Sequence, residues 1–147
     1  MDQTENIREL LLAAQKKAVE QVARVYDQIP LSKAFLRDAV RRYVFSRYLL
    51  DEDDYAGSDL NEITEYSLAK SMKISKELVK EFDIARSCAG SSSAIAKKVL
   101  LFMAIQRDFD VYLPTESTGR IKTIDDLSDL IWNGIMLKPV FVYPQAG

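Results

Sequence analysis

Few residues of this chain could carry chemistry. The only cysteine is Cys88, and a run of three serines, Ser91 to Ser93, follows it after Ala89 and Gly90. The sequence contains no histidine, so a serine or cysteine activated by a neighbouring imidazole is excluded. A single cysteine can form neither an internal disulfide nor a multi-cysteine zinc site. The serine run is therefore a candidate for helix capping, not for nucleophilic catalysis assisted by an imidazole.

The most acidic segment runs from Asp51 to Asp54. Four adjacent carboxylates could bind calcium, but an EF-hand loop needs alternating ligands, a central glycine and a closing glutamate, and this segment lacks that pattern. We interpret it as an acidic turn that ends a helix. Together with Tyr55-Ala56-Gly57 it also predicts a domain boundary.

The elements that position these residues are predicted to be helices. Of 147 residues, 48% are hydrophobic and 29% charged, with only 5 Gly and 4 Pro, a composition typical of a soluble, mainly helical protein. No apolar run of about 18 residues is present to span a membrane, and the first residues do not resemble a signal peptide. We therefore expect a cytoplasmic location.

Charge is unevenly distributed along the chain. Residues 1–48 hold nine basic and six acidic residues, a balance of +3, whereas residues 49–147 hold 11 and 16, a balance of −5. The two parts are expected either to differ in role or to complement each other.

Apolar periodicity and capping residues predict the helices. Ser32, Asp59 and Thr123 are the expected N-caps of the second, third and last of them, and Lys73 to Ser75 is an expected break. The predicted helices span residues 5–29, 33–49, 60–71, 76–82, 94–109 and 124–132, with a loop at 84–93 and an extended apolar tail at 135–143.

Two helix faces attract interest. The second helix carries Lys33, Arg37, Arg41 and Arg42 on one side, either a solvated basic face or one that binds an anion or a partner. The central helix, 94–109, is expected to bury a set of apolar residues, namely Ile95, Val99, Phe102 and Met103.

The segment after the central helix has a distinctive spacing. Phe109-Asp110 is followed by Pro114, Ile121, Thr123, Ile124 and Leu127. This spacing resembles the C-terminal half of the acyl carrier proteins, and the run from Ile63 to Ile131 resembles their four-helix fold. The resemblance implies an all-α protein with a carrier-like four-helix bundle at 58–134, an added N-terminal helix pair at 1–54 and an extended C-terminal tail at 135–147.

The resemblance also implies a binding site. In carrier proteins a serine at the start of the central helix bears 4′-phosphopantetheine, whose thiol holds an acyl group as a thioester. Ser93, fourteen positions after Val79, is the implied attachment residue, and a helix N-cap is the other interpretation of it. Counted back from Phe109, the family's serine falls instead on Ile95. Cys88 is interpreted as a small apolar residue rather than as a thiol carrier.

Two related functions follow. The first is a divergent carrier that presents a thioester-linked group to its phosphopantetheinyl transferase and to acyl-handling enzymes. Those partners should have an acidic docking face, because the central helix holds Lys97, Lys98 and Arg107 and no acid between 94 and 107. The alternative is a carrier-like adaptor that lacks the prosthetic group. In both, catalysis belongs to the partners, and we expect neither a metal nor enzymatic activity here.

A third interpretation belongs to another class. Ser75 to Ile84, followed by residues 91–98, loosely resembles a helix-turn-helix that would bind DNA. The connection is too long for that motif, and a segment with a balance of −5 suits a phosphate backbone poorly. We therefore expect no nucleic-acid partner.

Overall fold

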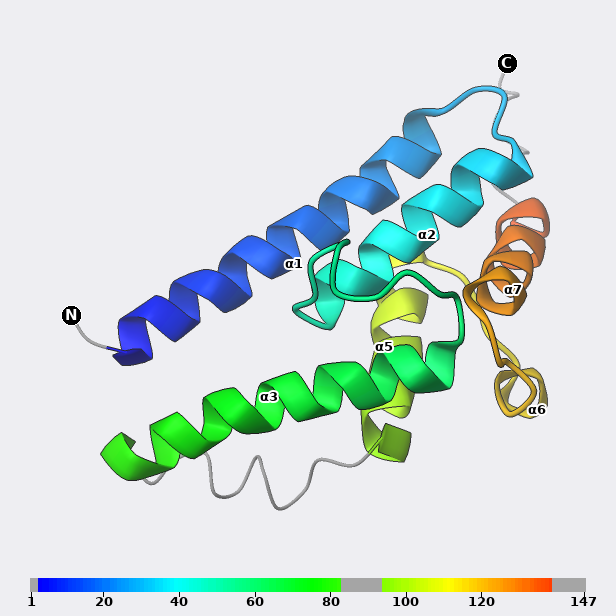
Figure 1. Cartoon of the computed structure of the whole chain (residues 1–147). Helices are drawn as coiled ribbons and strands as arrows, with labels where there is room; N and C mark the ends of the chain where they lie inside the picture. The colour runs from blue at the N-terminus through cyan, green and yellow to red at the C-terminus, as the bar shows by residue number, and fades with distance from the viewer. Residues whose placement is uncertain (1–2, 83–93, 139–147) are drawn as a thin grey trace.

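The computed structural model describes residues 3–82 and 94–138, and within these ranges the chain is all-α (Figure 1). The only strand-like contact in them is an isolated antiparallel bridge between Asp59 and Thr123. The six helices are α1 (Gln3–Asp27), α2 (Lys33–Arg47), α3 (Leu60–Phe82), α5 (Ala94–Phe109), α6 (Thr115–Thr118) and α7 (Ile124–Met136). The predicted fold class is confirmed at this level.

The first two helices form an antiparallel hairpin. α1 ends at Asp27, ahead of Pro30, and α2 begins after Ser32, whose hydroxyl accepts a hydrogen bond from the Phe35 amide at 3.1 Å. This is the predicted N-cap. A capping serine satisfies one of the amide groups left unpaired at a helix start.

The core lies around α2, which packs against α1 on one side and α7 on the other (Figure 1). The rings of Tyr43 on α2 and Phe109 on α5 meet edge to face, with centroids 5.2 Å apart. Leu36, Leu127 and Ile131 belong to the same buried cluster. The division of the chain into residues 1–54, 58–134 and 135–147 stays a prediction. In the described part of the chain, its first two segments share one core.

The start of α3 is held against the start of α7. The Leu60 amide donates to the Lys122 carbonyl at 2.8 Å, and the Ile124 amide donates to the Ser58 carbonyl at 2.9 Å. Thr123 caps α7 as predicted, in a reciprocal capping box with Asp126. These bonds fix where both helices begin.

α3 differs from its prediction in two ways. It runs without interruption through Lys73 to Ser75, where a break was expected, because that segment contains no glycine or proline and its neighbours are good helix formers. The apolar periodicity of this segment predicts that Tyr66 is buried, but Tyr66 is 43% exposed, while Thr64 and Ser67 are buried. Both hydroxyls are hydrogen-bonded to Tyr48, which makes their burial acceptable.

The last helix is longer than predicted. α7 continues past Gly134 to Met136, so the extended tail expected from Ile135 cannot begin there, and Ile135 is buried. Gly134 lies against Val111, where a Cβ atom would stand 2.8 Å from the Val111 Cβ. The glycine is present for close packing, not to end the helix. Residues 139–147 lie outside the described residues.

Candidate functional site

The candidate site comprises the start and the outward side of α5. Ser93, the predicted attachment residue, and Cys88 lie outside the described residues, so their surroundings remain predictions. α5 is described from Ala94, the residue after Ser93, and runs unbroken to Phe109. Ile95, to which the count back from Phe109 leads, lies in its first turn and is 77% exposed.

The inward side of α5 is firmly anchored. Leu101, Phe102, Ile105 and Phe109 are buried in the common core. Since they recur at steps of three and four, they define one face of the helix. The orientation of α5 therefore follows from the core, and the opposite side must face solvent.

That opposite side is also apolar. We define the α5 outer face as Ile95, Val99, Leu100 and Met103, which are all exposed, between 49% and 77%. The prediction that Ile95, Val99 and Met103 are buried was wrong. α5 is apolar on nearly every side, so periodicity cannot decide which side the body covers. The sequence did contain a signal for the exposed face. α5 has more apolar residues than one buried face can hold, so some of them had to lie on the surface.

Three cations border the α5 outer face, and each has a contact within the chain. The Lys97 ammonium lies 5.3 Å from the centroid of the Tyr48 ring, and burial lowers the pKa of Lys97. Lys98 donates to the Asn61 side chain at 2.7 Å. Arg107 donates to Asp108 at 2.8 Å.

A small hollow adjoins the α5 outer face. It has a volume of about 190 Å³ and lies between the end of α2 and α5, lined by Arg47, Tyr48, Lys97, Leu100 and Leu101. With its apolar floor and two cations, it suits an apolar side chain flanked by a carboxylate better than a free anion.

Asp108 fixes the end of α5. Its carboxylate accepts hydrogen bonds from the Tyr43 hydroxyl at 2.7 Å and from Arg107, with Arg47 at 4.0 Å. Burial alone would raise the pKa of Asp108, but the Arg107 and Tyr43 hydrogen bonds outweigh it and hold that pKa below its usual value. Burial, with the same hydrogen bond, raises the pKa of Tyr43 far above its ordinary value. We assign this cluster a structural role, because the Asp108 carboxylate and the Tyr43 hydroxyl both have hydrogen-bond partners within the fold.

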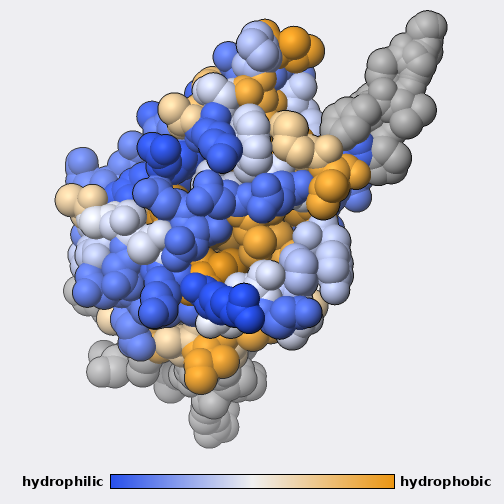
Figure 2. Space-filling model, turned by 90° about the vertical axis from the view of Figure 1, so that its right-hand side faces the viewer, coloured by the Kyte–Doolittle hydropathy of each residue, from blue (hydrophilic) through white to orange (hydrophobic). Residues whose placement is uncertain are grey.

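The basic side of α2 is used within the molecule. Arg37 pairs with Asp125 of α7 at 3.2 Å, Arg42 pairs with Asp38 and Glu52, and Arg41 donates to the carbonyls of Gly57 and Tyr55. Figure 2 shows the side of the molecule on which α6 and α7 lie, and hydrophilic residues cover most of it. Through these ion pairs and hydrogen bonds, the arginines on the basic side of α2 join this helix to α7 and to the segment after α2.

The acidic segment forms the predicted turn. The Asp51 amide donates to the Asp54 carboxylate at 2.7 Å, and this bond, followed by that from Lys70, lowers the pKa of Asp54. Within residues 3–82 and 94–138, no group of three or more acidic or cysteine side chains could hold a metal ion.

The helix-turn-helix interpretation is not favoured by this geometry. Ser75 begins no new helix, because α3 passes through it, and eleven residues separate Phe82 from Ala94. The tight turn of that motif is three or four residues long.

Comparison with known proteins finds no match to a family model, to a curated protein or to a solved structure. Among the described helices, none is both long and apolar enough to cross a membrane.

Proposed function

We propose that the chain is a carrier-like interaction subunit, which binds a partner protein through the α5 outer face and bears no phosphopantetheine arm. The observation that carries this proposal is the unbroken course of α5 from Ala94 to Phe109. Counted back from Phe109 along this uninterrupted helix, the position of the family's serine is held by Ile95, whose side chain has no hydroxyl to bear the arm.

The α5 outer face supports a binding role. Exposed contiguous apolar surface is uncommon on monomeric proteins and marks interaction sites. Met103 and Leu100 are 57% and 63% exposed on a helix whose other side is fixed in the core. The face therefore presents its side chains on a rigid support, which limits the entropy lost on binding.

The partner should present an apolar surface edged by Asp or Glu. Residues 94–107 contain no acid, and the hollow beside Leu100 is bordered by Arg47 and Lys97. Acidic groups opposite these cations would favour the correct partner and the correct orientation. In this proposal the partner performs any catalysis.

Intact mass tests the absence of the arm. The chain is expressed with a phosphopantetheinyl transferase and coenzyme A, beside a Ser93→Ala variant. We expect both proteins to keep the unmodified mass. A gain of one phosphopantetheine in the original chain that the Ser93→Ala variant lacks would overturn this part of the proposal.

Methionine oxidation in cells tests the binding face. Met103 and Met136 are 57% and 43% exposed, on α5 and α7, so they form a matched pair. Mild oxidation of the purified chain should modify both, whereas oxidation inside cells should spare Met103 if a partner covers the face. Equal modification of both methionines in cells would count against a partner on α5.

The second candidate is the carrier with the arm on Ser93. It is favoured by the place of Ser93 in the sequence, directly before the described part of α5, since carrier proteins bear the arm at the start of the central helix. Its partners would be the transferase and acyl-handling enzymes with an acidic docking face. The mass measurement separates the two candidates.

A further inference from the structure

The first half of α1 is helical but is not covered by the body. Leu10, Leu11 and Leu12 are 47%, 49% and 59% exposed, and the first buried side chain described in α1 is Ala18. Figure 1 shows α1 extending well past the end of α2. Isolated helices shorter than about 12–15 residues are marginal in water, and most helices gain stability by packing an apolar face. This half of α1 therefore lacks a packing partner.

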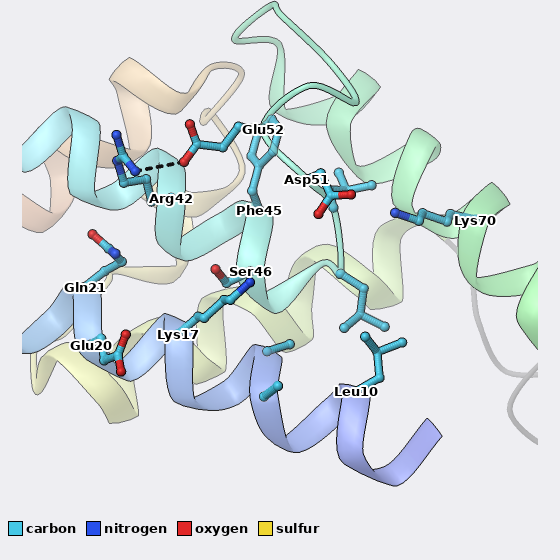
Figure 3. Close-up of a pocket in the computed structure, with 14 residues that line it drawn as sticks. Leu10, Lys17, Glu20, Gln21, Arg42, Phe45, Ser46, Asp51, Glu52 and Lys70 are labelled. Atoms are coloured by element: carbon cyan, nitrogen blue, oxygen red, sulfur yellow. Dashed lines mark hydrogen bonds and ion pairs between the residues drawn. The ribbon is translucent and has the colours of Figure 1, made fainter. Parts of the chain in front are cut away.

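A groove runs along this half of α1. It has a volume of about 440 Å³, and α2, the turn after it and Lys70 of α3 form its other walls (Figure 3). The apolar part of its lining comes from Leu10, Ala13, Ala14, Phe45, Leu49 and Leu50. Lys17 and Glu20 stand at its edge, exposed and without an ion pair in the described chain. The groove is open, with an apolar floor and a charged edge.

The sequence of this half of α1 is complementary to itself. Between Arg8-Glu9 and Lys16-Lys17 lies Leu10-Leu11-Leu12-Ala13-Ala14-Gln15. Two such helices placed antiparallel about an axis between Leu12 and Ala13 set Leu11 against Ala14 and Leu12 against Ala13, and large against small side chains interdigitate well. The same placement brings Glu9 of each copy beside Lys16 of the other.

Glu9 and Lys16 are placed so that each can form an ion pair with the other copy in this antiparallel arrangement. Glu9 and Lys16 are seven residues apart, two helical turns, and so lie on the same side of α1. Both are exposed, and neither forms an ion pair within the described residues. In a two-fold symmetric interface each contact occurs twice, so the pairing forms two Glu9–Lys16 contacts at once.

We propose that this chain forms a homodimer in which the first halves of α1 from two copies pack antiparallel, the α1 of each copy lying over the groove of the other. A small molecule in the groove would leave Glu9 and Lys16 unpaired, whereas a second copy pairs them. This proposal is independent of a partner on α5. It concerns a different surface and can fail without affecting the proposed function.

A charge-exchange experiment tests the dimer. The full-length chain is studied by sedimentation equilibrium over a range of concentrations, alone and as two variants, Glu9→Lys and Lys16→Glu/Lys17→Glu. We expect the unsubstituted chain to dimerise and each variant alone to bind itself about tenfold or more weakly, because like charges then face each other. An equimolar mixture of the two variants should form a heterodimer.

The matched control separates this contact from general charge attraction. Asp129 is exposed on α7, and Asp129→Lys gives the same net charge as Glu9→Lys. Mixed with the Lys16→Glu/Lys17→Glu variant, it should form no heterodimer. Far-ultraviolet circular dichroism checks that each variant is folded. A chain that stays monomeric at all concentrations, a dimer unaffected by both variants, or a heterodimer formed equally by Asp129→Lys would each overturn the proposal.

Discussion

α7 and the first half of α1 are both amphipathic helices, yet only α7 has its apolar side buried. In α7, Ile124, Leu127 and Ile131 are at most 1% exposed, and the start of the helix is capped by Thr123. In the first half of α1, Leu10 and Leu12 are half exposed. A periodic apolar pattern therefore predicts a helix in both regions, but burial depends on whether another element lies opposite.

The difference lies in what each helix packs against. α7 lies along α2 and has the segment after α5 behind it, where Val111 meets Gly134. The first half of α1 passes beyond α2 and has the open groove beside it. Substitutions in α7 and in the first half of α1 can test this comparison, because they should change the free energy of unfolding by different amounts.

The largest effect is expected for Ile131→Ala. Ile131 is fully buried, so its truncation should lower the free energy of unfolding by about 2–5 kcal/mol through lost burial and a cavity. Leu12→Ala in α1 should change it by less than about 0.5 kcal/mol. Urea unfolding, at concentrations where the chain is monomeric, measures both. Similar losses at the two sites would mean that α1 is covered within the monomer.

Gly134→Ala should have the next largest effect. The added methyl group meets the Val111 Cβ at 2.8 Å. We expect a net loss of about 1–2 kcal/mol, because overpacking of about 1–3 kcal/mol is partly offset by the better helix propensity of alanine. Gly119→Ala is the matched control, since the nearest atom that its Cβ would meet, the Glu116 carbonyl oxygen, is 3.9 Å away. Thermal unfolding of both variants should show a lower Tm only for Gly134→Ala.

Thr123→Ala should cost about 1 kcal/mol. It removes the hydroxyl that accepts from the Asp126 amide at 3.0 Å, and with it half of the capping box. Thr123→Ser keeps the acceptor and should recover most of the stability in the same denaturation measurement. If serine were no better than alanine, the threonine methyl group and not the cap would be responsible.

The smallest effect is expected from Asp108 and depends on pH. Its pKa is lower in the folded chain than the value of about 3.9 expected when unfolded. Its stabilising contribution is therefore complete above that unfolded value and is lost as the pH falls through the folded pKa. The stability difference between the original chain and Asp108→Asn should narrow below about pH 4, as measured by urea unfolding at several pH values. Asp129→Asn, on the exposed side of α7, should show no such narrowing.

Local signals were sufficient for most helix boundaries. Ser32 and Thr123 were recognisable as N-caps because their hydroxyls act on amides only three residues away. The signals failed where the deciding contact is distant in sequence. The last helix was predicted to end at residue 132, before Gly134, because the contact that requires this glycine is with Val111, 23 positions away.

The candidate site was predictable only in part. A central helix over residues 94–109 was predicted, and α5 is helical throughout that range. The side of that helix that faces solvent was predicted wrongly, with Val99 and Met103 placed inside. The groove along α1 could not be found from the sequence, because Leu10, Leu50 and Lys70 come from three separate segments.

The amino-acid sequence by itself determined that the described part of this protein is helical and where α2, α3 and α7 begin, because propensity, periodicity and caps act over a few residues. Only the tertiary structure decided which apolar sides are covered. Burial depends on neighbours that are distant in the chain, such as Tyr43 against Phe109. The same long-range packing left the α5 outer face and the first half of α1 open to partners.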